Sequence, residues 1–130
     1  MTPSLPLVAV VDDDESIRRS VRSLLRSASY DVAAFDSAEA FIASDLRSCT
    51  RCLVLDLSMP GMGGLQLLAH LKAIGEPIPA VILTAHGEER VRLLALQAGV
   101  IAFLTKPFRA EALLAAVSTC MSHEGERGGT

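Results

Sequence analysis

Five short apolar runs alternate with segments of helical periodicity along this chain of 130 residues. The runs are rich in Val, Ile and Leu, and several are apolar at every position, as is typical of strands buried on both faces. Strands that alternate regularly with helices predict a parallel sheet covered by helices on both sides. The runs occupy residues 7–11, 32–35, 52–57, 80–84 and 101–105.

Amphipathic spacing predicts helices between the runs. The first is expected around residues 17–28, where Arg18, Arg22 and Arg26 lie opposite the apolar side and are interpreted as a solvated face. Asp14 is expected to cap it. Later helices are expected to begin near Asp36 or Ser37, to include residues 65–71, to run from 88 to 98 before a C′ residue at Gly99, and to include residues 113–121.

This element order fits one fold class well. Right-handed crossovers restrict the topology, and five strands with five helices fit a flavodoxin-like (βα)5 three-layer sandwich with strand order 2-1-3-4-5. A single domain is expected over residues 1–121. Residues 122–130 are polar and glycine-rich, so they are interpreted as a tail or linker.

Composition excludes several classes of protein. Half of the residues are apolar, which argues against disorder. A net charge of −3 and the absence of Trp argue against direct nucleic-acid binding by this domain. Signal-peptide and membrane-span patterns are missing, so a cytoplasmic protein with no membrane contact is expected. The CxxC formed by Cys49 and Cys52 runs into a strand, and is interpreted as a loop thiol and a core thiol.

Polar residues follow four of the five apolar runs. In a parallel sheet the carboxyl ends of the strands meet at one edge, where ligands bind. Each residue alone has an ordinary explanation as a helix cap or a turn residue. Their convergence on one edge is what indicates a functional site. The residues are Asp12, Asp13 and Asp14 after the first run, Asp56 after the third, Thr84 at the end of the fourth and Lys106 after the fifth.

The chemistry of these side chains favours phosphoryl transfer. Clustered carboxylates repel one another unless a cation neutralises them, and oxygen ligands of this kind suit Mg²⁺. One carboxylate can act as a nucleophile toward phosphorus and form an aspartyl phosphate. Catalysis of such a transfer consists mainly of positioning and countercharge. Lys106 would supply countercharge beside Mg²⁺, and Thr84 a donor to a phosphoryl oxygen.

Four segments resemble the receiver domains of bacterial response regulators. They are the acidic cluster, residues 55–64 (LDLSMPGMGG), residues 83–85 (LTA) and residues 105–108 (TKPF), and the resemblance covers about residues 7–121. Residues 37–41 (SAEAF) and 84–87 (TAHG) are most similar to FixJ-type receivers. Such receivers usually precede a helix-turn-helix output domain, so control of transcription through a domain not in this chain is the implied output.

The resemblance implies roles for the site residues. It makes Asp56 the phosphoacceptor, supplied by a sensor histidine kinase. It implies Mg²⁺ ligation by Asp13, Asp56 and the backbone carbonyl of Ser58, with Asp12 reaching the metal through water. Lys106 would pair with the acceptor or its phosphate, and would precede a cis proline bond. The protein would catalyse only its own phosphorylation and dephosphorylation.

The resemblance also implies a switch. Thr84 would follow the phosphoryl group, and Phe103 would move with it, changing the surface formed by the fourth helix, fifth strand and fifth helix. That fourth helix is apolar on two sides, which predicts a docking surface. Leu93 is expected to pack against a neighbouring helix, whereas Leu96 and Val100 are expected to be exposed. With Phe103 they would form the interface of a phosphorylation-dependent homodimer or partner complex.

Ser58 and His86 occupy variable positions near the site, where receivers commonly tune the lifetime of the phosphoryl group. Two alternatives remain open. One is a phosphatase of the haloacid-dehalogenase type with Asp12 as nucleophile, although Ser16 does not fit its motif and Asp56 would have no role. The other is a pseudo-receiver, an interaction domain without phosphorylation.

Overall fold

A five-stranded parallel sheet forms the centre of the structure, a computed structural model that describes residues 6–85 and 89–128. The strand order is β2-β1-β3-β4-β5, which confirms the predicted 2-1-3-4-5 topology. The ends of each strand lie within two residues of the ends of the apolar run that predicted it. The strands are β1 (Leu7–Val11), β2 (Asp31–Phe35), β3 (Thr50–Leu55), β4 (Ala80–Thr84) and β5 (Ala102–Thr105).

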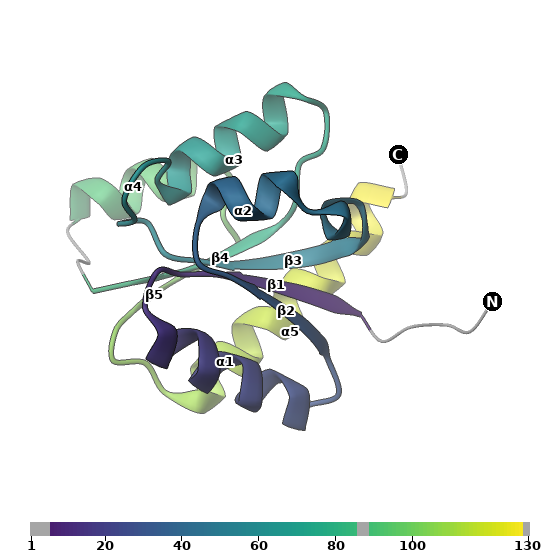
Figure 1. Ribbon diagram of the computed structural model, residues 1–130, viewed down its shortest axis with the longest axis vertical. Coiled ribbons are helices and arrows are strands. Elements are labelled where there is room, and N and C mark those ends of the chain that lie inside the picture. Colours follow the sequence, from purple (N-terminus) through teal and green to yellow (C-terminus); the bar gives the residue numbers. More distant parts are fainter. Residues whose placement is uncertain (1–5, 86–88, 129–130) are drawn as a thin grey trace.

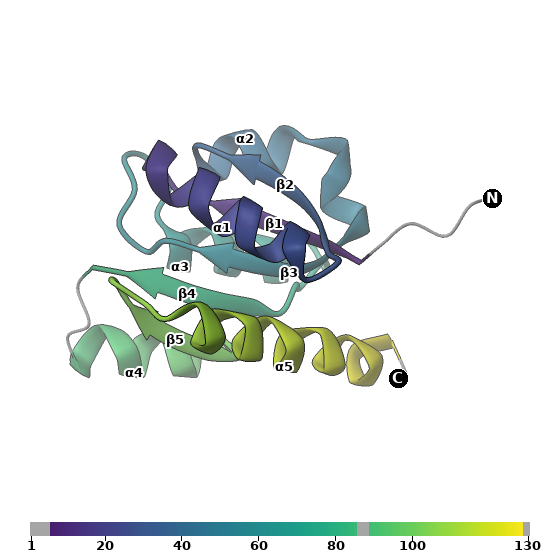
Figure 2. The ribbon, with the colours of Figure 1, turned by 90° about the horizontal axis from the view of Figure 1, so that it is seen from below.

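Helices cover both faces of the sheet, as predicted (Figure 1). Helices α2, α3 and α4 lie over one face, and α1 and α5 lie over the other. At one edge of the sheet α4 and α5 flank strand β5, as Figure 2 shows. The elements are α1 (Glu15–Ser27), α2 (Ala38–Ala43), the 3₁₀-helix η1 (Asp45–Cys49), α3 (Gly64–Ala73), α4 (Glu89–Gln97) and α5 (Ala110–Gly128).

Strand β3 shows how the core divides into two layers. Leu53 and Leu55 point into the layer beneath α2, α3 and α4, whereas Cys52 and Val54 point into the layer above α1 and α5. Successive side chains of a strand point to opposite faces, so a strand covered on both sides is apolar throughout. Cys52 is buried in this core and Cys49 is exposed, which confirms the interpretation of the CxxC.

Helix caps follow the sequence closely. The Asp14 side chain accepts a hydrogen bond of 2.8 Å from the backbone N–H of Ser16, which confirms it as the cap of α1. Ser37, rather than Asp36, caps α2 by accepting from the N–H of Ala40 at 3.0 Å. Helix α5 extends to Gly128, beyond the predicted end near residue 121, so residues 122–128 are helical.

Gly99 follows α4 with φ of +88°, as a C′ glycine does. Nothing lies within 4 Å of the position that a Cβ would occupy there, so a substitution would meet only the backbone strain of the left-handed region. Gly99→Ala is therefore expected to lower the free energy of unfolding by about 1 kcal/mol. Urea unfolding of both proteins measures the change. Equal midpoints would show that the C′ conformation relaxes without cost.

The exposed side of α4 differs from the expected one. Val100 is only 8% exposed, so its predicted place on the surface is wrong. The chain reverses at Gly99, the N–H of Val100 donates to the carbonyl of Ala95 at 3.3 Å, and its side chain enters the core. Leu93 is 50% exposed, so its predicted packing against a neighbouring helix is wrong too. Leu96 is 43% exposed, as predicted.

Helix α4 exposes large apolar side chains because it lies at an edge of the sheet and has the small Ala95 as its buried residue. Leu94 is exposed as well, at 47%. Among residues 6–85 and 89–128, no helix combines the length and the apolar character needed to cross a membrane.

Candidate functional site

Three aspartates meet where β1 and β3 end. Asp12 and Asp13 follow β1, and Asp56 follows β3. The last residues of these two strands are partners in the parallel register, so the three aspartates leave the sheet side by side. One carboxylate oxygen from each lies within 4.8 Å of the others. Asp12 and Asp56 are only 2% and 6% exposed, whereas Asp13 is open to solvent. The structure thus brings together the acidic residues that the strand ends predicted.

Lys106 reaches this cluster from the end of β5. Its Nζ donates a hydrogen bond of 2.9 Å to Oδ2 of Asp12 and lies 3.8 Å from Oδ2 of Asp56. The resemblance implied a pair with Asp56, but the short contact is to Asp12. The ammonium group is within ion-pair distance of both carboxylates. Its own bond to Pro107 is cis, as the resemblance implied.

Asp12 is held on every side. Its Oδ1 accepts from the N–H of Asp14 at 2.9 Å, and its Oδ2 accepts from Lys106. Its backbone carbonyl accepts from Nη1 of Arg18 at 2.8 Å. Sequence reasoning missed Arg18, because it belongs to an arginine series that reads as a solvated face. Only the fold shows that this arginine reaches back over the acidic loop.

Asp56 occupies a less satisfied position. Its Oδ1 accepts one hydrogen bond, of 3.2 Å, from the N–H of Ser58. Burial raises the pKa of Asp56 above its ordinary value, the Ser58 bond and Lys106 lower that pKa, and the negative charges of Asp12 and Asp13 raise it. Together these effects raise the pKa of Asp56. A cation beside the carboxylate would lower that pKa again, because it favours the ionised form.

Thr84 and Lys106 are neighbours across β4 and β5. Thr84 ends β4, is 1% exposed, and pairs in the register with Thr105. The N–H of Lys106 donates to the Thr84 carbonyl at 2.8 Å. Phe103 lies two residues before Thr105 on β5. Its partly buried side chain packs against the core layer beneath α3 and α4. His86 lies outside the described residues.

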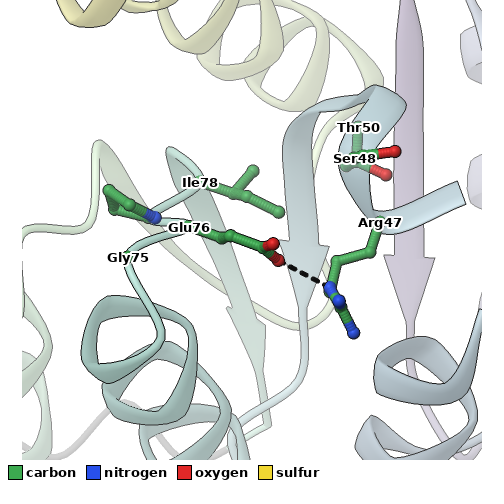
Figure 3. A pocket seen from close by; sticks show the side chains of 7 residues that line it. Arg47, Ser48, Thr50, Gly75, Glu76 and Ile78 are labelled. Carbon is green, nitrogen blue, oxygen red and sulfur yellow. Dashed lines mark hydrogen bonds and ion pairs between the residues drawn. The ribbon is translucent and has the colours of Figure 1, made fainter. Parts of the chain in front are cut away.

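A hollow of about 360 Å³ lies at the opposite end of the sheet, where β3 and β4 begin (Figure 3). Arg47 and Glu76 face each other across it, with Nε and Oε1 2.6 Å apart. Arg47 also donates to the carbonyl of Ile42 at 2.6 Å, and Thr50 donates to the carbonyl of Leu46 at 2.8 Å. These groups hold η1 and the α3–β4 connection together, which gives the lining of the hollow a structural explanation.

The model of the response regulator receiver domain family matches residues 8–118. This chain belongs to that family. The receiver is 37% identical over 121 residues to the response regulator protein TodT of Pseudomonas putida, a match that covers 93% of the chain and 53% of TodT. It is 38% identical over 128 residues to the transcriptional regulatory protein FixJ of Azorhizobium caulinodans, covering 98% of the chain and 60% of FixJ.

Solved structures agree with this assignment. The response regulator StyR superposes with a TM-score of 0.89 at 44% identity, covering 97% of this chain and 64% of StyR. FixJ-N superposes with a TM-score of 0.81 at 34% identity, covering 95% and 97% of the two chains. The receiver spans about half the length of the curated relatives it matches. Receiver domains of this family are regulatory, so the phosphatase alternative lacks support, and Asp12, with both carboxylate oxygens engaged, is poorly placed as a nucleophile.

Proposed function

We propose that this receiver takes a phosphoryl group from a sensor histidine kinase onto Asp56. The observation that supports this most is the arrangement of the Asp12, Asp13 and Asp56 carboxylates within 4.8 Å, with the Lys106 ammonium beside two of them. Asp56 has fewer hydrogen bonds than Asp12, so an oxygen of Asp56 is the better nucleophile. This domain of residues 1–121 would pass the signal through residues 122–130 to an output domain that controls transcription.

The donor set fits Mg²⁺. It consists of carboxylate oxygens without nitrogen or sulfur ligands, as hard divalent ions require. Asp13 and Asp56 would bind the ion with the carbonyl of Ser58, and the exposure of Asp13 leaves room for water ligands. Asp12 would act through water, because Lys106 and Asp14 already occupy its oxygens. When bound, the ion would neutralise the carboxylates and the equatorial phosphoryl oxygens.

The side chains would share the transfer in the following way. A carboxylate oxygen of Asp56 forms a bond to phosphorus while the bond from phosphorus to the donor breaks, and the donor leaves with that electron pair. Lys106 shifts from Asp12 toward the phosphoryl oxygens and balances their charge. The Thr84 hydroxyl donates to one of those oxygens. In dephosphorylation a water oxygen forms a bond to phosphorus while the bond from phosphorus to Asp56 breaks, which releases inorganic phosphate and restores the carboxylate.

Acetyl phosphate tests the proposal without the kinase. Intact mass should show one phosphoryl adduct after incubation with acetyl phosphate and Mg²⁺, and none when EDTA replaces Mg²⁺. A protein that stays unlabelled in Mg²⁺ would be a pseudo-receiver, and the proposed function would be wrong.

Mg²⁺ is expected to stabilise the fold, because it would bind the folded acidic cluster and not the unfolded chain. At a free concentration one hundred times its dissociation constant, the gain is about 2.7 kcal/mol. Asp13→Ala is expected to lose most of this gain. Urea unfolding with MgCl₂, against NaCl at equal ionic strength, measures it. If the variant gains as much as the wild type, Asp13 is not a ligand.

A further inference from the structure

The segment between Asp56 and α3, residues 57–63, is tied to α2 by a carboxylate outside the acidic cluster. Glu39, in the first turn of α2, accepts a hydrogen bond of 3.0 Å from the N–H of Met62 through Oε2. This bond joins positions 23 residues apart in the sequence. The same bond is the leading cause that lowers the pKa of Glu39, because it favours the ionised form of the carboxylate.

Gly61 shows how closely the segment approaches Glu39. A Cβ at Gly61 would lie 2.7 Å from Oε2 of Glu39, and φ at Gly61 is +77°. The backbone of two consecutive residues, Gly61 and Met62, therefore lies against one carboxylate. Such an approach is possible because glycine has no side chain and adopts this φ without strain.

Helix α2 gives Glu39 a fixed base. Its residues Ala38 and Phe41, on either side of Glu39, are fully buried, and Phe41 makes an edge-on ring contact with Phe35 at 5.4 Å. The Ser37 cap closes the start of the helix. Glu39 thus extends from a rigid element, and its contact with Met62 limits where the segment can lie.

The segment is fixed at its two ends by local bonds. Near the start, the N–H of Ser58 donates to Asp56 at 3.2 Å. At its end, the N–H of Gly63 donates to Oε1 of Gln66 at 2.8 Å, within the start of α3. Between these points, in the part of the chain that the structure describes, the Met62–Glu39 bond connects the segment to α2.

We propose that Glu39 is a positioning residue that holds residues 58–62 in place, so that the Ser58 carbonyl stays beside Asp56 for metal binding. The proposal rests on the proposed function of the acidic cluster. It gives a role to the SAEAF segment, which the phosphoryl chemistry does not use. Glu39 touches neither the phosphoryl group nor the metal, and acts through the backbone of Met62.

Three substitutions separate this role from others. Glu39→Ala removes the acceptor and is expected to weaken Mg²⁺ binding about 3-fold or more, because the segment must then be ordered when the ion binds. Glu39→Gln keeps an acceptor oxygen without the charge and should bind Mg²⁺ within about 2-fold of the wild type. Glu76→Ala removes a carboxylate at the opposite end of the sheet and should leave Mg²⁺ binding unchanged (Figure 3).

Titration calorimetry with MgCl₂ measures the affinities, and amide hydrogen exchange reads the segment itself. Exchange at residues 58–63 should quicken in Glu39→Ala but not in Glu39→Gln, while β3 and α5 stay as protected as in the wild type. Faster exchange throughout would show general destabilisation and overturn the proposal. Equal loss of affinity in Glu39→Ala and Glu39→Gln would assign the effect to charge and overturn it as well.

The two proposals fail in different ways. If the wild type binds Mg²⁺ and accepts a phosphoryl group while Glu39→Ala matches it in affinity and in exchange, the positioning role is wrong and the proposed function stands. If the wild type binds no Mg²⁺, the proposed function is wrong and the positioning role falls with it.

Discussion

Asp56→Asn is expected to accept no phosphoryl group from acetyl phosphate, whereas the wild type becomes labelled in Mg²⁺. The substitution keeps the shape of the side chain and removes the nucleophilic oxygen pair. Asp12 cannot replace it, because Lys106 and the N–H of Asp14 already bind its two carboxylate oxygens. Asp13 is exposed and lies farther from a fixed countercharge than Asp56. Intact mass after matched incubations measures the labelled fraction.

A second aspartate serves as the control. Asp31 is exposed at the beginning of β2, at the end of the sheet away from the acidic cluster. Asp31→Asn changes the net charge equally and should be labelled like the wild type. An adduct on Asp56→Asn at the wild-type level would move the acceptor to another residue. Peptide mapping after borohydride reduction would then locate it.

The same substitution is expected to change how stability depends on pH. The pKa of Asp56 is raised in the folded protein, mainly by burial, so the folded state holds this proton more tightly than the unfolded chain does. Its stabilising contribution is present below the unfolded pKa and is lost as pH rises through the folded pKa. Without Mg²⁺, Asp56→Asn should therefore lose less stability than the wild type as pH rises above about 4, the pKa of an aspartate in the unfolded chain. Urea unfolding across that range in EDTA measures the difference.

The sequence is sufficient to predict the sheet and the residues at its carboxyl edge. Both depend on local pattern, since apolar runs mark strands and Asp56, Thr84 and Lys106 stand directly at strand ends. Which carboxylate contacts Lys106 could not be predicted from the sequence. The topology brings Lys106 to the edge that holds both Asp12 and Asp56, and only side-chain geometry places its short contact on Asp12.

Residues that act across elements were missed for the same reason. Arg18 is half-buried and Glu39 is exposed, and both lie on the polar sides of amphipathic helices, where a charged side chain needs no partner. Their contacts, with the Asp12 carbonyl and the Met62 N–H, depend on how loops pass over those helices. The predicted exposure of Val100 was wrong for a different reason. Helical periodicity does not apply to Val100, because the chain reverses at Gly99 before it.

Helix α4 and its surroundings offer the surface through which phosphorylation is expected to act. Leu93, Leu94 and Leu96 are each between 43% and 50% exposed on one short helix. A hollow of about 330 Å³ lies where Arg92 of α4 meets β5 and the chain that leads into α5, and it is lined by Arg92, Phe103, Thr105, Phe108, Arg109 and neighbouring residues. Exposed leucines on α4, together with a hollow at the neighbouring strand, favour a docking surface on this side of the receiver.

Thr84 and Phe103 are expected to connect that surface with the acceptor. Thr84 ends β4 at the acidic edge, and Phe103 is on the adjacent strand at the rim of the hollow. If the Thr84 hydroxyl moves toward a phosphoryl oxygen, it vacates space into which the Phe103 ring can turn. The ring then leaves the hollow, and the surface offers a different apolar shape. One added charge would thereby shift a two-state equilibrium.

Phosphorylation is accordingly expected to make the receiver dimerise through α4, and Leu96→Glu is expected to prevent it. A carboxylate at a contact that excludes water costs enough to weaken a dimer about 30-fold or more. Leu46→Glu is the matched control, because Leu46 is 41% exposed on η1, on the far side of α2 from the acidic edge. Light scattering of the phosphorylated proteins should give dimer mass for the wild type and Leu46→Glu, and monomer mass for Leu96→Glu. A Leu96→Glu dimer as stable as the wild type would exclude this face and leave α1 and α5 as the surface to test.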